Sequence, residues 1–148
     1  MILRLATASA FLMGALAVVA GCGLSSDSGG CIHTVLKLQP VHLESRTAPL
    51  TLHARLTGEG KPLARFRLSF FLVFTGPTKL VGKSGKLPDL SGHATTDATG
   101  AATFRLPGGV AQIALPGETA VGYQVRFTIA KPVDHKEYCT AFAEAMFR

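Results

Sequence analysis

The sequence contains no tryptophan, only two tyrosines and only three cysteines among its 148 residues. So few amphipathic rings argue against an aromatic platform that stacks on sugars. Catalytic and metal-binding motifs are missing as well, because no Gly-x-Ser-x-Gly elbow, Cys-x-x-Cys pair or His-x-His pair is present. The sequence therefore predicts a protein that is not an enzyme and needs no cofactor.

Charge is also scarce at the N-terminus, where Arg4 is followed by an apolar run over residues 5–20. That run is shorter than the roughly 20 residues that span a bilayer, and small residues follow it. Its end, Val-Ala-Gly-Cys at 19–22, resembles the bacterial lipobox. The resemblance implies a signal peptide over residues 1–21 and a diacylglycerol group on Cys22. A plain secretory signal and an uncleaved membrane helix are the alternatives.

The cysteines agree with export across the membrane. Lipidation of Cys22 leaves the even pair Cys31 and Cys139. Extracytoplasmic compartments are oxidising and favour disulfides. We therefore predict a bond between Cys31 and Cys139, in a protein that is lipid-anchored on the extracytoplasmic side of a bacterial membrane.

The rest of the chain has the size and charge of one soluble domain. Fifteen Lys and Arg oppose nine Asp and Glu, and only Arg4 lies in the leader. The mature chain thus carries about +5, which suits attraction to anionic lipid or to an anionic envelope polymer. No run of basic residues and no nucleic-acid motif is present, so nucleic acid is not an expected partner.

Alternating patterns predict β-strands throughout the domain. Residues 65–74 contain four phenylalanines and alternate strictly, which predicts a central strand. Residues 50–57, 121–130 and 139–147 alternate in the same way, and Gly/Pro turns separate these segments. A Gly/Ser tether over residues 22–30 precedes them and spans roughly 15 Å. We expect an antiparallel β-sandwich over residues 31–148.

Several motifs in order resemble bacterial immunoglobulin-like domains of the invasin/intimin type. They are the strand and Gly-x-Pro turn of 51–64, the Phe-rich strand, the Thr-Asp-x-x-Gly-x-Ala hairpin of 96–102, and the strand around Gly122-Tyr-Gln-Val125. The resemblance implies an all-β, immunoglobulin-like antiparallel sandwich of about seven strands. In that fold the first and last strands run parallel, which places Cys31 and Cys139 at one end. Tyr123 is a candidate for a tyrosine-corner hydrogen bond.

Lys79, Lys83 and Lys86 form the only basic cluster on a predicted loop, residues 76–92. One interpretation is a solvated loop. The other is a contact for anionic lipid headgroups or envelope polymers, because a short tether holds the domain near the membrane.

Phe71 and Val73 lie on the strand face opposite Phe70 and Leu72. Apolar side chains on that face are either covered by the loop 76–92 or form a patch that binds a partner.

These features predict a non-catalytic binding or structural role at the bacterial cell envelope. The alternatives are an accessory subunit that holds a transporter or secreted enzyme at the membrane, and a carrier of a small ligand or metal. Three histidines, His33, His42 and His53, could lie on neighbouring strands, but their spacing matches no metal motif. We therefore expect solvated histidines and no metal.

Overall fold

The structure is a computed structural model that describes residues 30–76, 90–129 and 131–148. This part of the chain consists of β-strands joined by turns, with one short 3-10 helix. The elements are β1 (Thr34–Leu38), β2 (Leu50–Gly58), β3 (Lys61–Pro62), β4 (Arg67–Thr75), β5 (Leu90–Thr95), β6 (Ala101–Leu106), η1 (Gly109–Gln112), β7 (Thr119–Phe127) and β8 (Ala141–Met146).

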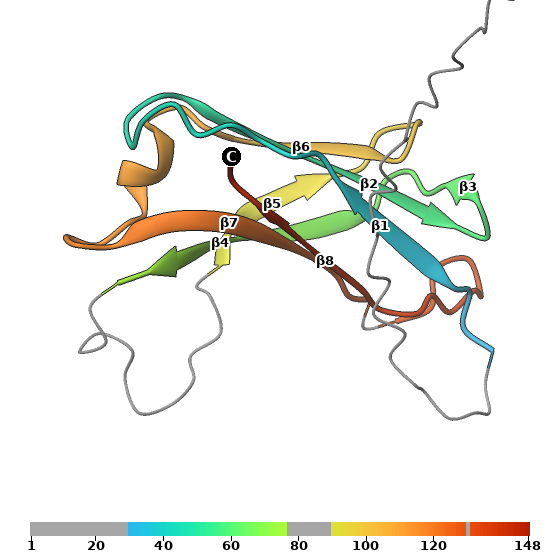
Figure 1. The fold of residues 1–148 in the computed structure, drawn as a ribbon. Coiled ribbons are helices and arrows are strands. Elements are labelled where there is room, and N and C mark those ends of the chain that lie inside the picture. The colour runs from blue at the N-terminus through green and yellow to red at the C-terminus, as the bar shows by residue number, and fades with distance from the viewer. Residues whose placement is uncertain (1–29, 77–89, 130) are drawn as a thin grey trace, which may run out of the picture.

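The strands form two sheets that face each other (Figure 1). In one sheet β2 pairs with β1 and with β6, and the short β3 pairs with the end of β2. The other sheet has the order β5-β4-β7-β8. All these pairings are antiparallel. The predicted all-β antiparallel sandwich is confirmed.

The strand order is immunoglobulin-like. Such sandwiches separate the strands corresponding to β1, β2 and β6 from those corresponding to β4, β7 and β8, and variable-type domains add an edge strand where β5 lies. The described residues form eight strands instead of about seven. The additional one, β3, has two residues and lies within the Gly-x-Pro turn predicted in residues 51–64.

The core fills the space between the sheets. Alternation along β4 buries Leu68, Phe70 and Leu72, whereas Ser69, Phe71 and Val73 on the other face are only half-buried. The Phe70 ring stacks on Phe104 of the opposite sheet, with 5.5 Å between centroids. The predicted central role of the Phe-rich strand is therefore confirmed. The largest fully buried side chains are Tyr123, Phe70, Phe127, Leu52, Leu56, Leu68, Leu72, Val110 and Val125.

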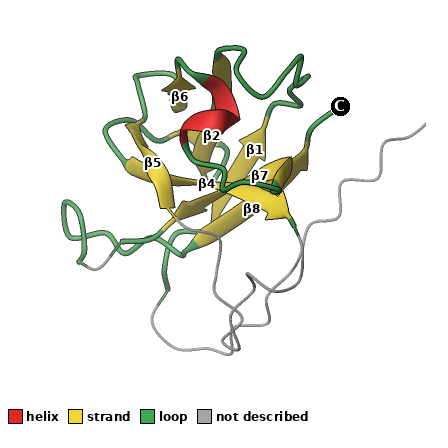
Figure 2. Ribbon diagram, turned by 90° about the vertical axis from the view of Figure 1, so that its left-hand side faces the viewer, coloured by secondary structure: helices red, strands yellow, loops and turns green. Residues whose placement is uncertain are grey.

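The short apolar segment after β6 is a 3-10 helix. Figure 2 shows η1 at one end of the sandwich, near the viewer. Val110 is fully buried there, so this turn covers that end of the core. Gly109, the first residue of η1, has φ of 66°, a left-handed conformation that glycine adopts without strain.

The hairpin predicted at Asp97 to Gly100 is present. The Asp97 carboxylate accepts hydrogen bonds from the backbone N–H and hydroxyl of Thr99 and from the N–H of Ala101. These hydrogen bonds, with the Thr99 hydroxyl first, lower the pKa of Asp97. The carboxylate is therefore occupied in shaping the turn.

The hydroxyl of Tyr123 connects the two sheets. It donates to the carbonyl of Gln39 at 2.6 Å and lies 3.1 Å from the carbonyl of His53. A tyrosine corner bonds backbone only a few residues upstream, so the suggested corner is wrong. The ring spans the core because Tyr123 points inward from β7 and is fully buried.

Replacing Tyr123 with Phe is expected to lower the free energy of unfolding by about 1–2 kcal/mol, because the Gln39 carbonyl loses its partner. Burial raises the pKa of Tyr123 to about 12. The folded chain therefore holds this proton more tightly than the unfolded chain, and stability falls as pH rises from about 10 to about 12.

Urea unfolding at pH 8 and pH 11 measures both effects. Tyr123→Phe should lose part of the alkaline destabilisation, whereas the control Tyr138→Phe should keep it. An unchanged pH dependence in Tyr123→Phe would contradict this role for the hydroxyl.

Candidate functional site

The two ends of the domain meet at one edge of the sandwich. Residue 32 forms a parallel bridge with Tyr138, and Val41 forms another with Phe147. Between these bridges β1 pairs with β2 of the other sheet. The segment from residue 32 to residue 41 thus contacts both sheets. Its second change of partner falls at Pro40, which has no backbone N–H to donate to a strand.

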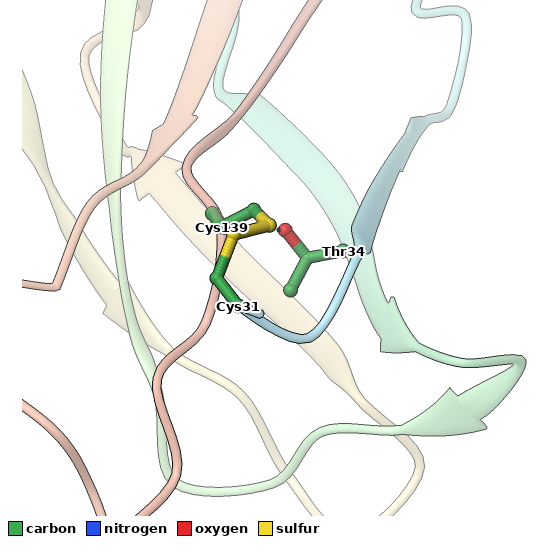
Figure 3. Close-up of a disulfide and its surroundings, with 3 residues drawn as sticks. All are labelled: Cys31, Thr34 and Cys139. Atoms are coloured by element: carbon green, nitrogen blue, oxygen red, sulfur yellow. Dashed lines mark hydrogen bonds between the residues drawn. A yellow bond between two sulfur atoms is a disulfide. The ribbon is translucent and has the colours of Figure 1, made fainter. Parts of the chain in front are cut away.

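A disulfide joins Cys31 to Cys139 where these segments begin (Figure 3). Their Cα atoms lie 5.1 Å apart, within the usual range for a disulfide. The Thr34 hydroxyl donates a 2.7 Å hydrogen bond to the Cys139 carbonyl. The predicted pairing is therefore present, and it closes a loop between residues 108 positions apart.

The two ends of β7 mark the two ends of the sandwich. We call the end at Phe127 the disulfide end and the end at Thr119 the far end. Phe127 pairs with Ala141, close to Cys139, whereas Thr119 pairs with Thr75 at the other end of β7. Nine residues of β7 separate the two ends, which corresponds to about 27 Å. The chain leaves β4 at the far end. Cys22, Lys79, Lys83 and Lys86 all lie outside the described residues.

We define the outer face as the solvent side of β4, β7 and β8. Phe71 pairs with Gln124, which in turn pairs with Glu144. Val73 pairs with Gly122, and Gly122 pairs with Met146. Phe71 and Val73 therefore face away from the core, as their alternation predicts, and both are half-buried.

Arg126 organises the part of the outer face nearest the disulfide end. Its guanidinium carbon lies 4.8 Å from the ring centroid of Phe71 and 5.7 Å from that of Phe142. A guanidinium over aromatic faces is held by cation–π attraction and keeps its N–H groups available. No described carboxylate lies within 4.0 Å of it. The Phe71 ring is thus covered in part by Arg126.

A shallow hollow lies beside this arginine, lined by Arg126, Thr128, Thr140, Ala141 and Phe142. Thr128 and Thr140 are exposed, and Phe142 exposes 56% of its surface. The hollow therefore offers a fixed cation, two hydroxyls and an apolar ring side by side. This combination suits an oxyanion attached to an apolar group.

Sequence reasoning missed Arg126, Thr128, Thr140 and Phe142. The available signal was the outward alternation on β8, where Phe142 and Met146 oppose the inward alanines and each exposes 56% of its surface. Arg126 could not be assigned a role because cation–π contacts depend on the register between strands, which one sequence does not reveal.

The histidines assemble no metal site within the ranges that the structure describes. His53 contacts the Thr103 hydroxyl at 3.1 Å, and His93 contacts the Ser69 hydroxyl at 3.2 Å. These ranges contain no group of three or more metal-ligating side chains. They also contain no helix that is sufficiently long and apolar to cross a bilayer.

A second shallow hollow adjoins the disulfide and is lined by Gly30, Ile32, Pro132, His135, Lys136 and Glu137. It is open to solvent and includes side chains of both charges. Its described lining residues include no serine, threonine or cysteine that could act as a nucleophile.

Comparison with known proteins gives no relative: no family model matches the chain, no curated protein matches it, and no solved structure matches it. Function must therefore be inferred from the residues themselves.

Proposed function

We propose that the protein is a bacterial lipoprotein whose immunoglobulin-like domain has a non-catalytic binding role at the cell envelope. Cys22 carries the lipid, residues 23–30 form the tether, and the sandwich lies on the extracytoplasmic side of the membrane. The similarity of residues 19–22 to the lipobox is the primary support.

The disulfide supplies further support. Cys31 and Cys139 are bonded to each other, so Cys22 is the one remaining cysteine of the three in the chain. Lipidation needs a cysteine thiol directly after the apolar leader, and Cys22 takes no part in the disulfide. Disulfides persist in exported proteins, which agrees with an extracytoplasmic domain.

Phase separation in a detergent that forms a separate phase on warming tests the anchor. The wild-type protein should enter the detergent phase, and Cys22→Ser should remain in the aqueous phase, because the acyl chains provide most of the affinity. Equal partitioning of the two proteins would reject the lipid anchor. Ser25→Ala in the tether is the matched control and should partition like wild type.

We also propose that Lys79, Lys83 and Lys86 contact a partner. Gly76, where the chain leaves β4, lies at the far end, whereas the tether joins at the disulfide end. Lys79, Lys83 and Lys86 follow Gly76 in the sequence. A protein or an anionic envelope polymer is the proposed contact of these lysines, because both can carry the opposite charge.

An accessory role, in which the domain holds a transporter or a secreted enzyme at the membrane, is the second candidate. The outer face favours it, because Phe142 and Met146 leave apolar surface exposed on one strand. Crosslinking in intact cells, followed by identification of the bound protein, distinguishes it from binding of a polymer.

A further inference from the structure

We infer that the hollow around Arg126 binds lipid phosphate groups of the bilayer that carries the anchor, so that the domain rests on the membrane by its disulfide end. This inference rests on the proposed lipid anchor. It concerns a site that neither the leader nor the lysine cluster predicts.

The position of the hollow is the first argument. Thr140 follows Cys139 directly, and Cys139 is bonded to Cys31, where the tether ends. A tether of residues 23–30 spans roughly 15 Å, so the bilayer surface lies within reach of this end. The far end is about 27 Å further away along β7.

The chemistry of the hollow is the second argument. Arginine binds phosphate through its planar fork of N–H groups, and the rings of Phe71 and Phe142 already hold the Arg126 guanidinium in place. The hydroxyls of Thr128 and Thr140 supply additional donors beside it. Phosphate oxygens would satisfy these donors together.

The exposed ring of Phe142 is the third argument. An apolar side chain next to a cation is typical of surfaces that enter the boundary between headgroups and acyl chains. A soluble polymer would leave Phe142 in water, whereas a lipid would cover it. This difference is why we assign the phosphate to a lipid.

Besides Arg126, strands β4, β7 and β8 carry one charge of each sign, Arg67 and Glu144. Glu144 is the nearest acidic residue on β8, and its carboxylate accepts a 2.8 Å hydrogen bond from the Gln124 amide. Arg67 is exposed and lies two residues before Ser69, the residue that pairs with Arg126. It therefore adds positive charge to the same part of the face.

The absence of tryptophan gives a direct test, because a single introduced Trp reports its own surroundings. Phe142→Trp and the control Leu115→Trp are made in the lipidated protein. Leu115 is equally suitable for labelling, since it exposes 51% of its surface and precedes β7 at the far end. Each protein is incorporated in phosphatidylglycerol vesicles whose acyl chains carry bromine, which quenches Trp inside the bilayer.

We expect blue-shifted, quenched emission from Phe142→Trp and unquenched emission from Leu115→Trp. Adding Arg126→Gln to Phe142→Trp should shift the equilibrium away from the docked state about fivefold, since one basic residue contributes about that factor near a membrane. The control is Arg105→Gln, which removes the same charge from an exposed residue of β6 in the other sheet. This variant should leave the quenching of the Trp at position 142 unchanged.

The outcomes are distinguishable. The protein could float with the vesicles while Phe142→Trp is not quenched, or while both Trp variants are quenched equally. Either result would reject the docking site and leave the lipid anchor valid. Failure of the protein to float would reject the anchor and the inference together. If a soluble glycerol phosphate polymer abolishes quenching in a manner that requires Arg126, the site binds the polymer and the assignment to lipid is wrong.

Discussion

Replacing Cys31 and Cys139 together with serine is expected to lower the free energy of unfolding by about 2–5 kcal/mol. The bond closes almost the whole domain, because its cysteines are 108 positions apart. Long loops lose the most conformational entropy in the unfolded chain, so the bond destabilises the unfolded state strongly. The melting temperature should fall by roughly 10–20 °C.

Thermal unfolding of the purified domain with and without reductant provides the measurement. Thr34→Val is the matched control, because it removes the hydrogen bond to the Cys139 carbonyl and keeps the disulfide. It should cost about 1 kcal/mol. If the double serine variant is no less stable than Thr34→Val, the disulfide does not stabilise the domain as we describe.

Phe70→Ala is expected to destabilise the domain by about 3–5 kcal/mol. Its ring is fully buried and stacks on Phe104, so the truncation leaves a cavity between the sheets. Phe71→Ala, one position along β4, removes the same atoms from the outer face and should cost about 1 kcal/mol. Urea unfolding of both variants gives the comparison.

A similar loss in both variants would contradict the assignment of Phe70 to the core and Phe71 to the outer face. The comparison of Phe70→Ala with Phe71→Ala is informative because both variants remove the same side chain from the same strand. Only the direction in which the side chain points differs, and that direction is what the alternation in the sequence predicts.

Much of the sandwich could be predicted because its strands alternate strictly. The inward set of β4, the Asp97 hairpin and the alanines of β8 were each evident from residue types and spacing. The disulfide could be predicted because cysteine number and compartment left one pairing. Strand alternation, turn motifs and the number of cysteines can all be read from a single sequence.

The outer face could not be assembled from the sequence. Arg126 contacts Phe71 and Phe142 through the registers of β7 with two neighbouring strands. Likewise the Tyr123 hydroxyl bonds Gln39, which is 84 positions away, instead of a nearby carbonyl. Such contacts follow from strand pairing and sheet packing, which are decided by the whole fold.

The lipid on Cys22 is the central claim, since the location of the domain and the docking of its disulfide end depend on it. Mass spectrometry of the N-terminal peptide, from protein isolated with the membrane fraction, tests it most directly. We predict a chain that begins at Cys22 and carries diacylglycerol on the cysteine sulfur. A peptide that begins at Met1, or an unmodified Cys22, would contradict the account.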